Sequence, residues 1–191
     1  MRRPPAHAAS VLLEDPVRID VADLWDPRYD DAWRVIPTNL GWKKNGENVM
    51  GAGLAKQTAL RHPDLPALYG EFCQRVKNYE LVPLFAYNKL LLFPVKPLNV
   101  ARPWLSWNQP ADIGLIWRSA EALNRFYRYE RVAVPLVGAG NGQLPHVAVL
   151  DVLHRFWGGG DKWTLVITRE CFSLLSLSGA IQSELLAGKV Q

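Results

Sequence analysis

Two glycine-rich segments carry the residues best suited to hold a phosphorylated ligand. The first glycine loop is Met50-Gly51-Ala52-Gly53-Leu54-Ala55, and the second glycine loop is Gly138-Ala139-Gly140-Asn141-Gly142-Gln143-Leu144. Glycine lets the backbone approach a ligand closely, and free N–H groups at the start of a helix favour anions. Two such loops facing one crevice would suit a diphosphate, whereas the alternative is that each glycine only turns the chain. Neither loop has the GxxxxGK[ST] signature of nucleoside triphosphatases or the GxGxxG-plus-acid pattern of nicotinamide-binding domains, so both classes are excluded.

Each glycine loop is expected to leave a strand and to open a helix. Apolar runs and alternation predict strands at 17–21, 33–37, 81–87, 89–93, 131–137 and 163–168. Helical spacing and start signals predict helices after the first glycine loop, at 65–76, at 112–127, at 145–157 and in the tail from residue 173. Residues 94–111, with four prolines and two tryptophans, are expected to form a long ordered loop. This alternation predicts an α/β sandwich with a largely parallel sheet.

Composition is that of one globular domain preceded by a short lead-in. The chain has 191 residues, of which 49% are hydrophobic and 21% charged, and this balance excludes a disordered protein. We expect residues 1–16 to be a flexible lead-in and residues 17–191 to be a single domain. No stretch approaches 18 uncharged apolar residues, so a membrane span is not expected. The net charge of +4 permits an anionic ligand or nucleic acid as a partner. The sequence has no run of five or more basic residues, so a polybasic arm is not expected.

Cysteine usage bears on metal binding and compartment. The sequence has two cysteines, Cys73 and Cys171, without a CxxC pair or a Cys/His cluster. A disulfide framework and a zinc site are therefore not expected, and a reducing cytoplasm is the predicted location. We expect no metal and no cofactor.

Several stretches of the sequence together resemble macrodomains. Residues 36–39 (IPTN), 49–57 (VMGAGLAKQ) and 61–64 (RHPD) match the first half, and residues 133–144 (AVPLVGAGNGQL) match the second half in the correct order. The resemblance spans roughly residues 17–168. It is greatest to the branch with an MGxGxA first loop, which contains terminal ADP-ribose protein glycohydrolase, DarG-type DNA ADP-ribosyl glycohydrolase antitoxins and ADP-ribose-1″-phosphate phosphatases. It implies a three-layer α/β/α macrodomain sandwich with a mixed, largely parallel sheet that binds ADP-ribose.

The resemblance implies a place on ADP-ribose for individual residues. Asp23 stands where the family holds the adenine amino group, because a carboxylate accepts hydrogen bonds and adenine N6 donates them; a helix N-cap is the alternative. Asn39 matches an asparagine that lies near the distal ribose in the family. The alternative is that Asn39 is an ordinary turn residue after a buried strand. The predicted ADP-ribose-binding residues are Asp23, Leu24, Thr38, Asn39, Met50, Gly51, Ala52, Gly53, Leu54, Ala55, Gly138, Ala139, Gly140, Asn141, Gly142 and Gln143.

Lys96 is the predicted catalytic residue. Residues 92–96 (LFPVK) resemble the NFPTK of the DNA-directed antitoxins, whose lysine is catalytic. A lysine in a ligand crevice loses hydration, its pKa falls, and its amine can act on an anomeric carbon or as a base. The alternative is a solvated lysine that follows a strand.

Comparison of the other motifs leaves the branch partly open. Gly142 stands where the terminal glycohydrolase has an aspartate, and the DNA-directed antitoxins also have glycine there. Two features differ from the DNA-directed antitoxins. The segment 97–110 is a few residues longer than the corresponding segment of the antitoxins, and the HWR pattern of the antitoxins is absent. In this segment Trp104 and Trp107 could stack on a base, but we favour the interpretation that they anchor the loop to the domain.

The resemblance therefore implies a hydrolase that removes ADP-ribose from a nucleic acid base or a protein side chain, with Lys96 in the catalytic role. A non-catalytic ADP-ribose reader and an ADP-ribose-1″-phosphate phosphatase remain the alternatives. The implied partners are ADP-ribose or ADP-ribosylated DNA or protein, and a cognate ADP-ribosyltransferase toxin is a further candidate. We expect a monomer that does not associate with membranes.

Overall fold

The strands of the protein form one mixed sheet. The computed structural model describes residues 18–76, 82, 84–126, 131–157 and 162–181. The strands are β1 (Arg18–Val21), β2 (Trp33–Asn39), β3 (Phe85–Tyr87), β4 (Leu90–Lys96), β5 (Val132–Pro135) and β6 (Trp163–Ile167), in the order β1-β6-β5-β2-β4-β3. Every neighbouring pair is parallel except β3 with β4. The predicted mixed, largely parallel sheet is confirmed.

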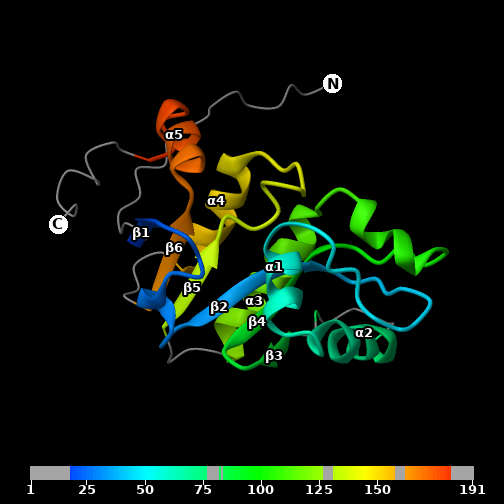
Figure 1. Ribbon diagram of the computed structural model, residues 1–191. Helices are drawn as coiled ribbons and strands as arrows, with labels where there is room; N and C mark the ends of the chain where they lie inside the picture. The colour runs from blue at the N-terminus through cyan, green and yellow to red at the C-terminus, as the bar shows by residue number, and fades with distance from the viewer. Residues whose placement is uncertain (1–17, 77–81, 83, 127–130, 158–161, 182–191) are drawn as a thin grey trace, which may run out of the picture.

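Helices cover both faces of this sheet (Figure 1). They are α1 (Gly53–Arg61), α2 (Leu65–Arg75), α3 (Ile113–Phe126), α4 (His146–Trp157) and α5 (Arg169–Leu177). Successive strand residues enter opposite cores, as the two-residue period of a strand requires. Val35 packs in the core with α3, α4 and α5, whereas Ile36 packs in the core with α1 and α2. The predicted three-layer α/β/α sandwich is therefore confirmed.

Most predicted elements are found close to their expected bounds. The hairpin turn expected at Asn88 is present, and Asn88 and Lys89 both have positive φ values (45° and 59°), as in a two-residue hairpin turn. The strand expected from Leu81 begins only at Phe85. Leu81 and Pro83, which belong to that expected strand, lie outside the described residues. The helix after the first glycine loop extends beyond residue 57 to Arg61.

Two expectations about irregular segments were wrong. Residues 94–111 are not all loop, because β4 continues to Lys96 and Pro103–Asn108 form a 3-10 helix, η2. The last helix begins at Arg169 rather than at residue 173, because the Thr168 side chain caps it by accepting from the Cys171 N–H. The lead-in at 1–16, Val17 and the glycines at 158–160 lie outside the described residues.

Two features are absent from the part of the chain that the structure describes. It contains no helix long and apolar enough to span a bilayer. It also contains no cluster of three or more histidine, cysteine, aspartate or glutamate residues that could hold a metal ion.

Candidate functional site

The two glycine loops meet at one edge of the sheet. They follow β2 and β5, which are parallel neighbours, so both lie beyond the carboxyl ends of central strands. A Cβ atom added at Gly53 would lie 3.0 Å from Asn141 Nδ2, which shows that the loops touch. A Cβ added at Gly51 or Gly140 would meet nothing within 4 Å, and both glycines are exposed. The loops therefore present bare backbone to open space on either side of their contact.

The first glycine loop leads directly into α1. Ala52 is the N-cap residue, and no side chain caps the helix there. Gly53 has a φ of +54°, a conformation that other residues rarely adopt. The N–H groups of the first turn consequently remain available to an anionic ligand.

The second glycine loop is a tight turn that leaves no room at one position. The Gln143 N–H donates to Gly140 O at 2.9 Å, and the Leu144 N–H donates to Gly138 O at 3.1 Å. A Cβ added at Gly142 would lie 2.3 Å from Gly138 O. Position 142 therefore excludes a side chain in this conformation, and the aspartate of the terminal glycohydrolases has no place in this loop.

Asn39 holds the segment that leads to the first glycine loop. Its side chain is buried, accepts from the Gly41 N–H at 2.9 Å and donates to Val49 O at 2.8 Å. Asn48, a fully buried residue that the sequence analysis missed, donates from Nδ2 to Asn39 O at 2.9 Å and to Gly41 O at 2.7 Å. Asn39 thus has the turn-holding contacts of its alternative role, and its contact with the distal ribose stays a prediction. Nothing in the local sequence around Asn48 indicated its buried position.

Three other predicted binding residues have side chains in the core. Leu24 and Met50 are buried with α1 and α2. The buried Thr38 hydroxyl shares a hydrogen bond of 2.9 Å with the Tyr69 hydroxyl on α2. Only the backbone of these three residues can contribute to a ligand site at the sheet edge.

Asp23 lies beyond the end of β1 and is exposed. Its Oδ1 accepts from the Trp25 N–H at 2.8 Å in a local turn. The helix N-cap considered as its alternative role is not formed, because the N-cap of the following 3-10 helix, η1 (Pro27–Tyr29), is Asp26. Because β6 separates β1 from β5, Asp23 stands to one side of the glycine loops. Its second oxygen, Oδ2, can still accept a hydrogen bond from a ligand.

Lys96 stands on the other side of the loops, at the end of β4. It pairs in register with Asn39, and the Leu40 N–H donates to Lys96 O at 3.2 Å. Its Nζ donates to Trp107 O at 2.7 Å. Burial lowers the pKa of the Lys96 amine below its ordinary value, because desolvation disfavours the charged form. Lys96 is therefore a partly desolvated and held amine, which differs from the fully solvated lysine considered as its alternative.

The two tryptophans of η2 are partly exposed, so they can contribute both to packing of the segment and to its surface. Trp104 is 43% exposed and Trp107 is 49% exposed. Ser106, between them, is fully buried, and its Oγ accepts from the Asn99 N–H at 2.9 Å. Gly41 permits this packing, since a Cβ there would lie 2.0 Å from Pro103 O. The indoles are consequently available at the surface near Lys96.

Comparisons with solved structures give a consistent picture. The chain is similar to the macrodomain of Thermus aquaticus DarG (TM-score 0.60, 21% identity, covering 81% of this chain and 98% of that one). It is also similar to the macrodomain of Mycobacterium tuberculosis DarG (TM-score 0.59, 22% identity, 81% and 98%). Thermosipho africanus DarTG in complex with ADP-ribose matches with a TM-score of 0.55 and 20% identity, covering 72% of this chain and 38% of that one. No family model and no curated protein matches the sequence.

Proposed function

Because the chain has the macrodomain fold, we propose that it binds ADP-ribose along the edge of the sheet where the glycine loops meet. We further propose that it hydrolyses the bond between ADP-ribose and a nucleic acid base or protein side chain, with Lys96 as the catalytic residue. The observation that carries the proposal is the position of Lys96, at the same sheet edge as two touching glycine loops, the first of which opens a helix without a side-chain cap.

The proposed orientation of the ligand follows the order of the strands. The diphosphate would lie between the loops, where exposed backbone and the start of α1 favour negative charge. Asp23, beyond β1, would accept from the adenine amino group through Oδ2. Lys96, beyond β4, would then stand at the distal ribose, because β2 and β4 lie on the opposite side of the loops from β1.

The chemistry assigned to Lys96 uses its neutral amine. Desolvation increases the neutral fraction at a given pH, and a neutral amine can either attack the anomeric carbon or accept a proton. In the net reaction the bond from the anomeric carbon to the leaving group breaks, the leaving group gains a proton, and water supplies the new hydroxyl. Backbone N–H groups around the diphosphate hold the rest of the substrate in place during that step.

The contact between Lys96 and Trp107 also favours a second candidate, a non-catalytic ADP-ribose reader. In a reader the lysine would serve only to hold η2 by its hydrogen bond to the Trp107 carbonyl. A panel of three substrates separates the candidates: thymidine-linked ADP-ribose, glutamate-linked ADP-ribose and ADP-ribose-1″-phosphate. Release of ADP-ribose from either of the first two supports the hydrolase, release of phosphate supports the phosphatase, and tight binding without any release supports the reader. A cognate ADP-ribosyltransferase toxin remains part of the proposal.

A further inference from the structure

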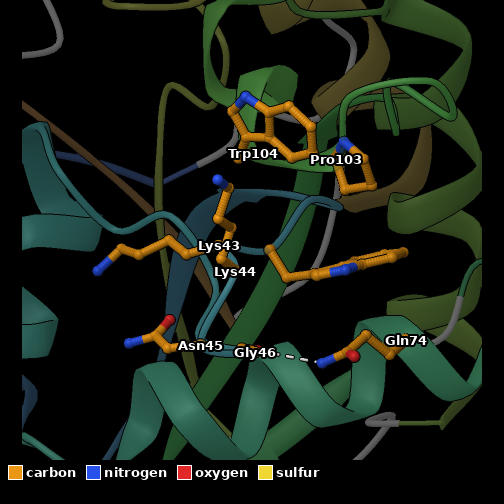
Figure 2. A pocket seen from close by; sticks show the side chains of 8 residues that line it. Lys43, Lys44, Asn45, Gly46, Gln74, Pro103 and Trp104 are labelled. Carbon is orange, nitrogen blue, oxygen red and sulfur yellow. Dashed lines mark hydrogen bonds between the residues drawn. The ribbon is translucent and has the colours of Figure 1, made fainter.

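A cavity lies between the segment 42–46, α2 and η2. It has a volume of about 390 Å³ and is bounded by residues 42–46, by Gln74 of α2 and by Pro103 and Trp104 of η2. Figure 2 shows Pro103 and Trp104 on one side of the cavity and Gly46 with Gln74 on the other. None of these residues is among the predicted ADP-ribose-binding residues. A volume of this size is within the range of small-molecule sites (about 300–1,000 Å³).

The lining combines aromatic rings with positive charge. Trp42 and Trp104 supply indoles, and Lys43 and Lys44 supply two ammonium groups. Lys43 pairs with Glu47 at 2.9 Å. Lys44 is exposed, and no hydrogen bond or ion pair of its side chain is found within the described residues. Its charge is therefore available to an anion.

The walls of the cavity are fixed by close backbone contacts. On one side, Gly70 lets residues 46–48 lie directly on α2, since a Cβ there would be 2.0 Å from Gly46 O. Gln74 Nε2 donates to the same Gly46 oxygen at 3.2 Å, and the Asn48 N–H donates to Pro66 O at 2.7 Å. On the other side, Gly41 packs against Pro103 O. The cavity is thus formed before any ligand binds, which reduces the entropy lost on binding.

The cavity and the candidate catalytic lysine both contact η2. Trp104, which lines the cavity, and Trp107, whose carbonyl holds Lys96 Nζ, both belong to η2. They are three residues apart, which is one turn of a 3-10 helix. A polymer whose modified unit reached Lys96 would therefore pass close to the cavity.

We propose that this cavity, the lysine–tryptophan pocket (residues 42–46, 74, 103 and 104), binds a nucleotide of a single-stranded nucleic acid. Its base would stack on an indole, and its phosphate would contact Lys44. Proteins that bind single strands use this combination of aromatic platforms and positive charge. An acidic peptide would use the lysines but gain little from the indoles, and a duplex buries the faces of its bases. The identification of this strand as the carrier of ADP-ribose rests on the proposed function, whereas binding of the strand itself does not.

The test is fluorescence anisotropy of a labelled, unmodified oligothymidylate with the full chain, in the presence and absence of saturating ADP-ribose. We expect binding that survives ADP-ribose, because the two sites are separate. Trp104→Ala and Lys44→Glu should each weaken it about tenfold, since stacking on one aromatic side chain contributes this much or more. Trp117→Ala and Arg118→Glu, matched controls on α3 across the sheet, should bind as the wild type does.

Parallel probes decide the class of ligand. Comparison of an oligouridylate RNA with the oligothymidylate shows whether the pocket accepts ribose, deoxyribose or both. Binding of either strand, weakened in Trp104→Ala and Lys44→Glu, supports the proposal. Absence of wild-type binding to both strands would overturn it, as would unchanged binding in Trp104→Ala and Lys44→Glu. Equal binding of polyglutamate, with the same loss in both variants, would overturn it in favour of a protein partner. Calorimetry with ADP-ribose on the same variants tests the proposed function separately, because these substitutions should leave that affinity unchanged.

Discussion

Lys96 and Trp107 are joined by a hydrogen bond of 2.7 Å from the lysine Nζ to the tryptophan carbonyl oxygen. The bond attaches η2 to the end of β4. The helix that carries the two partly exposed tryptophans therefore lies beside the candidate catalytic amine. Because its partner is a neutral carbonyl, the bond holds the amine without the strong stabilisation of the charged form that a carboxylate would supply. The lowered pKa of Lys96 is consistent with that arrangement.

The glycine loops provide the first prediction. Gly140→Glu should fold, because open space surrounds the position, but it should abolish ADP-ribose binding by placing a carboxylate beside the diphosphate. Gly53→Glu should do the same with an added loss of stability, since its φ is +54°. For the wild type we expect a Kd in the micromolar range, about −8 kcal/mol, by calorimetry. Gly140→Ala adds a methyl group without charge and should weaken binding less than Gly140→Glu does. Unchanged affinity in both glutamate variants would place the ligand elsewhere.

Asp23 provides a prediction that distinguishes a residue that holds a local turn from one that also contacts the ligand. Asp23→Asn preserves an Oδ1 that can accept from the Trp25 N–H, but its amide nitrogen cannot accept from adenine. We expect ADP-ribose to bind about tenfold more weakly, because a hydrogen bond to a charged acceptor contributes about 1.5–3 kcal/mol. Ribose-5-phosphate, which lacks adenine, should bind equally to both proteins. Equal losses for the two ligands would leave Asp23 with its local turn as its single role.

Gly142 provides a prediction about the branch of the family. Introducing the aspartate of the terminal glycohydrolases, as Gly142→Asp, should destabilise the protein by about 1–3 kcal/mol, because the added atoms overlap Gly138 O and Ala111. Thermal unfolding should therefore show a lower Tm, and turnover of the glutamate-linked substrate should not increase. A stable Gly142→Asp protein with increased turnover would mean that the loop readily adopts the other conformation.

The parts of the site that could be predicted are those that follow strands. Alternating and apolar runs located β2, β4 and β5, and parallel strands end at the same edge, so both glycine loops were expected to face one crevice. The place of Lys96 in the site was expected from the resemblance of residues 92–96 to the DNA-directed antitoxins. The lysine–tryptophan pocket could not be predicted, because it depends on close approaches between distant segments, such as Gly41 with Pro103. Asn48 was missed for the same reason. Hydrophobic periodicity carries no information about such contacts.

Substitution of Lys96 by arginine provides a prediction that distinguishes a structural role, in which the side chain holds η2, from a catalytic role. In Lys96→Arg the guanidinium can still donate to the Trp107 carbonyl, but it stays protonated and cannot serve as a nucleophile or base. We expect ADP-ribose binding to remain and turnover of thymidine-linked or glutamate-linked substrate to disappear. Lys96→Ala should also lose turnover, with ADP-ribose binding largely preserved. If either variant turned over substrate as fast as the wild type does, another residue of the site would have to be the catalytic one.

The pH dependence of turnover provides the last prediction. Burial lowers the pKa of Lys96 below its ordinary value, and the proposed reaction needs the neutral amine. The rate at saturating substrate should therefore rise with pH as the amine loses its proton, and it should level off above the lowered pKa. The midpoint should lie below the lysine value of 10.5, and it should be measured by single turnover so that product release does not mask it. Residual activity in Lys96→Ala should lack this midpoint. A rate that is independent of pH up to the ordinary lysine range, or that falls as the amine becomes neutral, would show that the ammonium form is the one required.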